Sequence, residues 1–308
     1  MNLLSRCAMI AATSLLTLTL SISTHAQDMK YKAFTVKTPD GVNISAQEWG
    51  NPNGPEIVLI HGFGQSHLSW IRQVNSELAK EFRIITYDMR GHGNSDKPLE
   101  RDKYQESKYW ADEVQAIIDT AKLKRPVLVG WSYGGRVLSD YLKIHGASRL
   151  AGLSYVDASS KTDPSFYGAG VVPFIVGMNS NDLATNIAST RKFLRACFEK
   201  QPTQDEFEAM LAFNMLVPTQ VRMNMGGRSL NIDDIFQKLT IPVLVTQGEK
   251  DQLALVAMSK HTATIIPGAK LSIYPGIGHA PFFEDAPRFN TELAAFVRDA
   301  NRAGSSIR

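Results

Sequence analysis

One serine of this chain lies in a short segment framed by glycines, between an expected strand and an expected helix. The segment is Gly130-Trp131-Ser132-Tyr133-Gly134, preceded by the apolar residues 126–129 and followed by helical periodicity from residue 135. A G-x-S-x-G sequence in this context is typical of a nucleophile elbow, in which strained backbone exposes the hydroxyl and small residues let the strand and helix pack closely. Ser132 is therefore a candidate nucleophile.

A serine hydroxyl becomes a good nucleophile when a base takes its proton and a third group orients that base. Two later loops offer these groups. Asp251 follows the apolar residues 242–246, and His279 follows the strand-like residues 270–274. Loops beyond the carboxyl ends of parallel strands are where an open α/β sheet places reactive groups. We predict that Ser132, Asp251 and His279 form a catalytic triad.

Other acids and histidines compete for two of these roles. Asp157 ends the strand-like residues 150–156 and is an alternative acid, whereas Asp88 lies in a turn that its side chain can hold by hydrogen bonds. Among the histidines, His61 and His92 belong to glycine turns, and His67 is close enough in sequence to one of them to reach a pocket mouth. We favour Asp251 as the acid and His279 as the base.

Acyl transfer also requires donors for the negative charge that develops on the carbonyl oxygen. A glycine turn, His61-Gly62-Phe63-Gly64, follows the first buried-strand pattern at residues 56–60. We expect the backbone N–H groups of Phe63 and Tyr133 to form the oxyanion hole. In other enzymes, one such donor stabilises the transition state by roughly 2.7 to 4 kcal/mol.

The elements that must position these groups alternate along the chain. Antiparallel strands are expected at residues 30–37 and 43–49, parallel strands at 56–60, 83–87, 127–129 and 150–156, and helices at 70–80, 107–121, 135–145 and 287–298. Alternation of strands and helices predicts an α/β fold with a mostly parallel, doubly wound sheet, here with a leading antiparallel hairpin.

A long interval interrupts this alternation. Residues 159–240 replace what would be a short connection in a compact domain, and helical patterns occur at 182–199 and 204–213. We interpret this interval as a helical cap or lid inserted between two parts of the α/β core, residues 27–158 and 241–308. Apolar residues such as Phe193 and Met225 either pack the cap or line a substrate pocket.

Together with the segment from Tyr87 to Ser95, these motifs resemble the α/β-hydrolase superfamily along nearly all of the chain after residue 26. The likeness is strongest to serine esterases known as non-haem haloperoxidases, whose patterns resemble His61-Gly62-Phe63, Ser69-Trp70 and residues 131–135. Serine at the elbow differs from the aspartate of haloalkane dehalogenases and epoxide hydrolases. Ala280 after the histidine differs from the tryptophan of meta-cleavage hydrolases. Gly64 stands where perhydrolase-type members often have proline.

The resemblance implies hydrolysis of a small-to-medium carboxylic ester through an acyl-enzyme. Perhydrolysis, haloperoxidase-like activity or lactone hydrolysis in the same site are alternatives. A ligand receptor or carrier that keeps the fold without doing chemistry is an alternative of another class. The expected partner is a small-molecule ester, and the chemistry requires no cofactor.

Composition narrows the remaining possibilities. Residues 1–26 have the pattern of a secretory signal with cleavage after Ala26, which predicts a secreted or periplasmic protein without stable membrane anchoring. The net charge of +3 and the lack of basic runs argue against nucleic-acid binding. No histidine or cysteine spacing predicts a metal site, and Cys197 has no partner cysteine beyond the signal segment. The sequence leaves the oligomeric state open.

Overall fold

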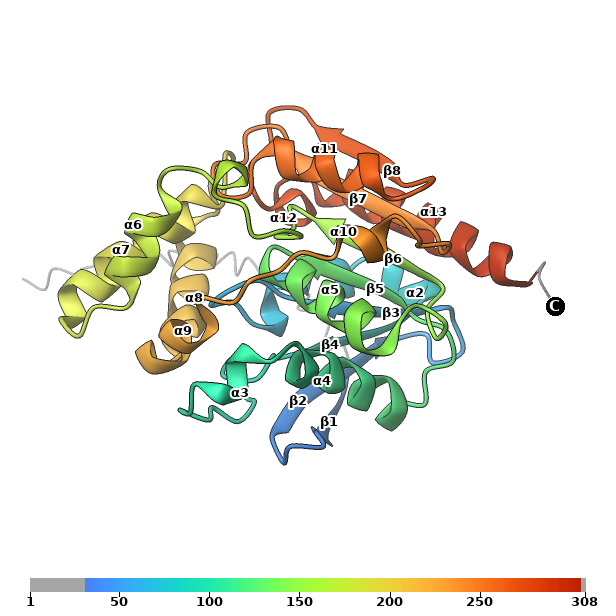
Figure 1. Ribbon diagram of the computed structural model, residues 1–308, viewed down its shortest axis with the longest axis horizontal. Coiled ribbons are helices and arrows are strands. Elements are labelled where there is room, and N and C mark those ends of the chain that lie inside the picture. Colours follow the sequence, from blue (N-terminus) through green and yellow to red (C-terminus); the bar gives the residue numbers. More distant parts are fainter. Residues whose placement is uncertain (1–30, 306–308) are drawn as a thin grey trace, which may run out of the picture.

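The computed structural model describes residues 31–305, so the predicted signal segment lies outside the described residues. Their centre is a sheet of eight strands in the order β1-β2-β4-β3-β5-β6-β7-β8 (Figure 1). The strands are β1 (Lys32–Lys37), β2 (Asn43–Gly50), β3 (Glu56–Ile60), β4 (Arg83–Tyr87), β5 (Val127–Trp131), β6 (Gly152–Val156), β7 (Val243–Gly248) and β8 (Lys270–Tyr274). β2 pairs antiparallel with β1 and β4, and all other pairs are parallel. The predicted mostly parallel sheet with a leading hairpin is confirmed.

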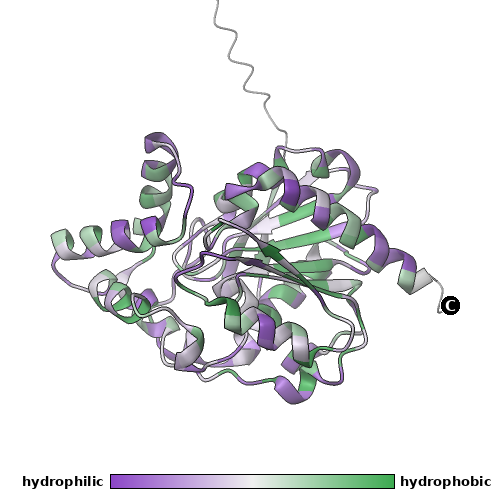
Figure 2. Cartoon of the chain, turned by 90° about the horizontal axis from the view of Figure 1, so that it is seen from above, coloured by the Kyte–Doolittle hydropathy of each residue, from purple (hydrophilic) through white to green (hydrophobic). Residues whose placement is uncertain are grey.

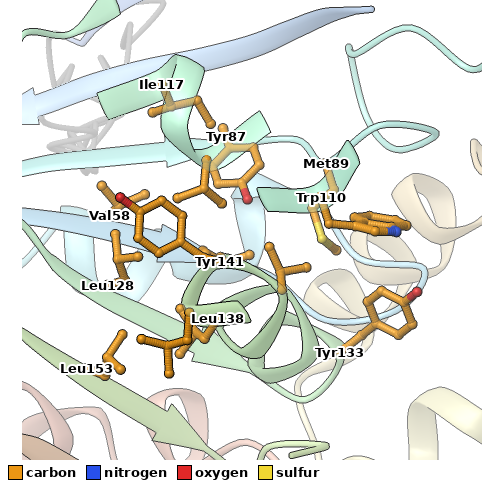
Figure 3. Packing of buried hydrophobic residues seen from close by; sticks show 14 of the residues in the cluster. Val58, Tyr87, Met89, Trp110, Ile117, Leu128, Tyr133, Leu138, Tyr141 and Leu153 are labelled. Carbon is orange, nitrogen blue, oxygen red and sulfur yellow. The ribbon is translucent and has the colours of Figure 1, made fainter. Parts of the chain in front are cut away.

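Both faces of the sheet are buried along the central strands β3 to β7, as their apolar runs require. In β3, Val58 and Ile60 belong to one hydrophobic cluster, whereas Ile57 and Leu59 belong to the other. Figure 3 shows the first cluster, where side chains of the strands such as Leu128 meet residues of the covering helices such as Leu138. In Figure 2 the strands at the centre of the sheet are mostly hydrophobic, and the helices around them carry both polar and apolar residues.

Helices divide between the two faces. The first cluster includes residues of α4 (Ser107–Thr120), α5 (Tyr133–His145) and α10 (Asp233–Phe236), with α11 (Val256–Ile265) packed beside them. The second includes residues of α1 (Ile71–Val74), α2 (Leu78–Glu81), α12 (Pro281–Glu284) and α13 (Ala286–Ser305). The doubly wound arrangement is therefore present.

One expected helix is interrupted. Residues 70–80 form the short 3-10 helix η1 (His67–Trp70), α1 and α2 instead of one continuous helix. The break falls at Asn75 and Ser76, where the Ser76 hydroxyl donates to the backbone carbonyl of Gln73 and accepts from the N–H of Leu78. Side chains of these types compete with helical hydrogen bonds, which explains the interruption. The C-terminal helix is longer than predicted and ends at Ser305.

The interval between β6 and β7 is mainly helical. It contains η2 (Pro164–Phe166), α6 (Val171–Met178), α7 (Leu183–Ala196), α8 (Gln204–Met215), α9 (Thr219–Met225) and α10. In Figure 1, α6 to α9 form a layer at one end of the sheet. The boundaries of the cap at residues 159 and 240 remain a prediction. The short helix α3 (Asp102–Gln105) contacts α9. Within residues 31–305, no helix combines the length and apolarity needed to cross a membrane.

Candidate active site

Ser132 lies between the end of β5 and the start of α5 in strained backbone. Its φ of 53° and ψ of −114° fall in a region that L-residues rarely adopt. Hydrogen bonds hold it there. The Ser132 N–H donates to the carbonyl of Val156 at 3.0 Å, and the Ser132 carbonyl accepts from the N–H groups of Gly135 and Ser159. The expected elbow geometry is thus present, and it depends on the neighbouring strand β6.

The glycines around Ser132 have no space for a side chain. A Cβ atom on Gly130 would lie 2.5 Å from the carbonyl oxygen of Gly134, and one on Gly134 would lie 2.6 Å from the carbonyl oxygen of Ile60. Both distances are shorter than a real carbon atom tolerates, so larger residues would push α5 away from the sheet.

Asp251 and His279 are in direct contact. Nδ1 of His279 lies 2.7 Å from Oδ2 of Asp251, and both side chains are buried. The other oxygen of Asp251 accepts from the N–H groups of Leu253 and Ala254 at 2.8 and 3.1 Å. The two residues lie in the loops after β7 and β8. Because Nδ1 faces the aspartate, Nε2 is the ring nitrogen left to act on a hydroxyl.

Ser132 and His279 line the same cavity, which has a volume of about 640 Å³. This volume is in the usual range for small-molecule sites. The structure therefore brings together all three residues that the sequence predicted for a triad. A second cavity of about 200 Å³ is lined by Trp131 but by neither Ser132 nor His279.

Asp157, the alternative acid, lies beside this pair without replacing Asp251. Its Oδ1 accepts from the N–H of Gly248 at 2.8 Å and from Nε2 of Gln247 at 2.9 Å, while its Oδ2 has no hydrogen-bond partner. Complete burial, together with the nearby charge of Asp251, raises the pKa of Asp157 well above its usual range. Both effects favour the protonated, neutral form of Asp157.

Asp157, Asp251 and His279 are the set of described residues that could hold a metal ion, because one ligand atom from each lies within 4.8 Å of the others. The hydrogen bonds already described account for their proximity. Both oxygens of Asp251 are occupied by donors, since Oδ2 also accepts from Gln247 at 3.1 Å. The cluster is therefore a hydrogen-bonded network around His279.

The expected oxyanion turn packs directly against Ser132. A Cβ atom on Gly62 would lie 3.2 Å from the Cβ atom of Ser132. Phe63 follows in this turn, and Tyr133 is the first residue of α5, where backbone N–H groups have no intrahelical partner. Phe63 and Tyr133 both line the cavity. Their positions suit the role that the sequence predicted for their N–H groups.

The competing histidines are engaged elsewhere. The fully buried His61 accepts from the N–H of Met89 at 3.0 Å, and His92 accepts from the N–H of Gly64 at 3.1 Å. Burial lowers the pKa of His61 to about 4 and that of His92 to about 3, so both rings are neutral. His67 lies 2.8 Å from Asp88 and does not line the cavity.

Sequence reasoning missed three arginines in the cavity wall, Arg136, Arg222 and Arg228. Arg136 lies four residues after Ser132 on α5, and this spacing was an available indication. The other two come from α9 and the loop after it, and no motif marked them. The apolar residues Phe193 and Met225, which were predicted to pack the cap or line the pocket, are buried and line the cavity.

Among the described residues, the sheet order, the strained serine and the buried histidine–aspartate pair define the class of α/β-hydrolase enzymes. Residues 55–286 match the family described as the alpha/beta hydrolase fold. The chain therefore belongs to the α/β-hydrolase family, and its relatives place it among enzymes of the esterase and haloperoxidase type.

Three relatives illustrate this placement. A crystal structure of a putative aryl esterase from Burkholderia cenocepacia is 36% identical, with a TM-score of 0.85 over 88% of this chain and 100% of that chain. Esterase RhEst1 from Rhodococcus sp. ECU1013 is 32% identical, with a TM-score of 0.82 over 86% and 98%. A bifunctional esterase/perhydrolase from Acinetobacter calcoaceticus is 26% identical over 85% of this chain and 99% of its own length.

Proposed function

We propose that this protein is a serine hydrolase that cleaves small-to-medium carboxylic esters through an acyl-enzyme. The observation that carries the proposal is the 2.7 Å contact between His279 and Asp251 at the wall of a cavity that Ser132 also lines. A nucleophile, an oriented base and a strained elbow in one cavity are the parts that acyl transfer requires.

In the proposed mechanism, Nε2 of His279 takes the proton of Ser132 as its Oγ attacks the ester carbonyl carbon. The backbone N–H groups of Phe63 and Tyr133 stabilise the resulting oxyanion, and Asp251 stabilises the protonated imidazole. The carbon–oxygen bond to the alcohol then breaks, and His279 gives its proton to the departing alcohol. Water, deprotonated by His279, attacks the acyl-enzyme and releases the acid, which restores Ser132.

One feature of the oxyanion turn favours hydrolysis over perhydrolysis. Gly64 has a φ of 71°, and its N–H donates to His92. Proline has a φ near −65° and no N–H, so this turn differs from that of the perhydrolase-type members with proline at this position. Lactone hydrolysis would use the same residues and remains the second candidate activity.

The test is turnover of p-nitrophenyl esters from acetate to decanoate by the mature protein, with Ser132→Ala as the inactive variant. A fluorophosphonate probe followed by intact mass measures the nucleophile separately. We expect chain-length-dependent turnover and a single adduct, both lost in Ser132→Ala. Turnover that survives this substitution would contradict the assignment, and a complete lack of labelling would favour the receptor or carrier.

We also propose that the protein is exported to the periplasm or beyond, with cleavage after Ala26. Expression of the full chain in a bacterial host, followed by fractionation and N-terminal sequencing, tests this. The expected mature protein begins at Gln27, and an uncleaved protein confined to the cytoplasm would contradict it.

A further inference from the structure

The charged side chains that line the large cavity are all positive. Arg136, Arg222 and Arg228 line it, and no Asp or Glu does so among the described residues. The rest of the wall is largely apolar, with residues such as Phe63 and Phe193. Unpaired charges in an apolar wall are costly, which makes this excess of cations informative about the ligand.

One of the three arginines has a carboxylate partner. Arg228 lies 2.6 Å from Oδ2 of the buried Asp140, and this ion pair satisfies its charge. Its guanidinium also lies 5.3 Å from the ring centre of Trp110 and 5.8 Å from that of Tyr133. The charge of Arg228 is therefore balanced within the protein by Asp140.

Arg222 has neutral partners only. Its guanidinium donates to the backbone carbonyls of Met178 and Asn214 and to Oδ1 of Asn186, at 3.1, 2.6 and 3.0 Å. The side chain is 1% exposed, and its Nε has no partner. Burial lowers its pKa to about 10, so the group still carries its charge at neutral pH. A buried cation without a counterion thus stands in the cavity wall.

Arg136 also lacks a carboxylate hydrogen-bond partner, and the carboxylate near it, Asp140, is already paired with Arg228. The guanidinium of Arg136 donates to the carbonyl of Arg228 at 2.7 Å and to the hydroxyl of Thr162 at 3.2 Å, and Ser159 is 3.5 Å away. None of these partners is charged, although Arg136 is 7% exposed. Arg136 and Ser132 are four residues apart and line the same cavity.

Hydroxyl groups surround Arg136 on the cavity side. The hydroxyls of Ser159 and Tyr167 lie 2.5 Å apart, and both residues line the cavity together with Thr162. The Tyr167 hydroxyl donates to the backbone carbonyl of Lys161 at 3.0 Å, so these hydroxyls are held in place within the protein. The guanidinium of Arg136 is the donor suited to a carboxylate, because hydrogen bonds between ionised groups are the stronger ones. This polar corner contrasts with the apolar remainder of the cavity.

We propose that the substrate is an ester that carries a carboxylate, which binds to Arg136 while the ester carbonyl reaches Ser132. Arg222 adds positive potential to the same cavity. The proposal rests on the proposed ester hydrolysis and names its substrate class. The carboxylate belongs either to the acyl part, as in a monoester of a dicarboxylic acid, or to the alcohol part, as in an ester of a hydroxybenzoate.

Two matched substrate pairs test the proposal and separate these sources. Monoethyl glutarate against ethyl glutaramate places the charge on the acyl side, and 4-butyryloxybenzoate against 4-butyryloxybenzamide places it on the alcohol side. Since a hydrogen bond to a charged group is strong, we expect kcat/KM of the anion to exceed that of the amide by about 10- to 100-fold in one pair. A ratio of one or less in both pairs would overturn the inference.

Substitutions test whether Arg136 causes the preference for the anionic substrate. In Arg136→Gln the ratio should fall to about one, and Arg136→Lys should restore part of it because the charge remains. Arg149→Gln is the matched control, since Arg149 is half exposed and pairs with Asp119 on the surface. It should keep the full ratio. An unchanged ratio in Arg136→Gln would overturn the role of Arg136.

A binding measurement covers the case in which Arg136→Gln does not fold or no tested ester is cleaved. Calorimetric titration of Ser132→Ala with glutarate and 4-hydroxybenzoate, each against its amide, measures anion preference without turnover. Tighter binding of at least one carboxylate supports the inference, and equal binding overturns it. Hydrolysis of neutral esters without any anion preference would leave the proposed function standing, whereas anion binding without fluorophosphonate labelling would contradict that function alone.

Discussion

Nε1 of Trp131 donates a hydrogen bond of 2.7 Å to the backbone carbonyl of His279. Trp131 is the last residue of β5 and precedes Ser132, whereas His279 lies in the loop after β8. The N–H of His279 donates to the carbonyl of Cys197 at 2.9 Å. The backbone of the proposed base is therefore fixed on both sides, and one anchor comes from the residue beside Ser132.

Trp131→Phe removes this anchor and keeps an aromatic ring. We expect kcat for p-nitrophenyl butyrate to fall by about 3- to 30-fold with little change in KM, because small misplacements of a base reduce the rate steeply. Trp49→Phe is the matched control, since its buried indole donates to Thr86 at 2.9 Å away from the cavity. Equal kcat values for the two variants would show that Trp131 does not position His279.

The two buried acids should respond differently to the same substitution. Asp251→Asn removes the charge that orients His279, and we expect kcat to fall by roughly 10⁴-fold. Asp157→Asn should keep activity within about tenfold, because a neutral amide oxygen can accept the same bonds from Gln247 and Gly248. Steady-state kinetics of both variants decides between them. Loss of activity in Asp157→Asn with retention in Asp251→Asn would reverse the assignment.

Sequence patterns located most of the framework and the three residues of the predicted triad. Strands β3, β4 and β8 begin and end as expected. β3 and β4 are short, largely apolar runs, whereas β8 alternates polar and apolar residues before a turn at Pro275 and Gly276. The choice between Asp157 and Asp251 was harder, since both follow buried strands. The two acids differ in the conformation of the loops that hold them. Asp251 turns toward His279, while Asp157 is held by the end of β7.

Sequence patterns did not predict which charged residues line the cavity. Arg222 and Arg228 belong to a helix and a loop whose sequences carry no motif, and their place in the cavity wall depends on how α9 packs at one end of the sheet. The break at Asn75 was missed because apolar spacing continues through it. Hydrophobic periodicity and residue type therefore identified elements and reactive groups, but the walls of the cavity arise from tertiary packing that local sequence does not encode.

The elbow has no space for even one additional methyl group at Gly134. Gly134→Ala places a Cβ atom 2.6 Å from the backbone carbonyl of Ile60, which cannot move without disturbing β3. We expect the free energy of unfolding to fall by about 1 to 3 kcal/mol or more, the usual cost of overpacking. Gly226→Ala is the control, because its Cβ atom would lie 3.4 Å from the nearest atom. Urea denaturation measures both, and equal stabilities would refute the steric argument.

Acid should destabilise the protein through His61 and His92. Their pKa values in the folded state are about 4 and about 3, against an ordinary value of 6.5. Below pH 6.5 the unfolded chain binds protons that the folded state excludes, so stability is fully present above this pH and is lost as the pH falls toward 4. Between pH 7.5 and 5, each histidine should cost roughly 1 to 2 kcal/mol.

The variant His92→Gln isolates one of these contributions from other titrating groups. Glutamine has no titrating ring and offers an oxygen that can accept from the N–H of Gly64 in place of Nε2. The variant should be less stable than the original protein at pH 7.5 but should lose less stability on going to pH 5. Urea denaturation at a series of pH values compares the two proteins. Parallel stability curves would mean that His92 titrates alike in the folded and unfolded states, contrary to its complete burial.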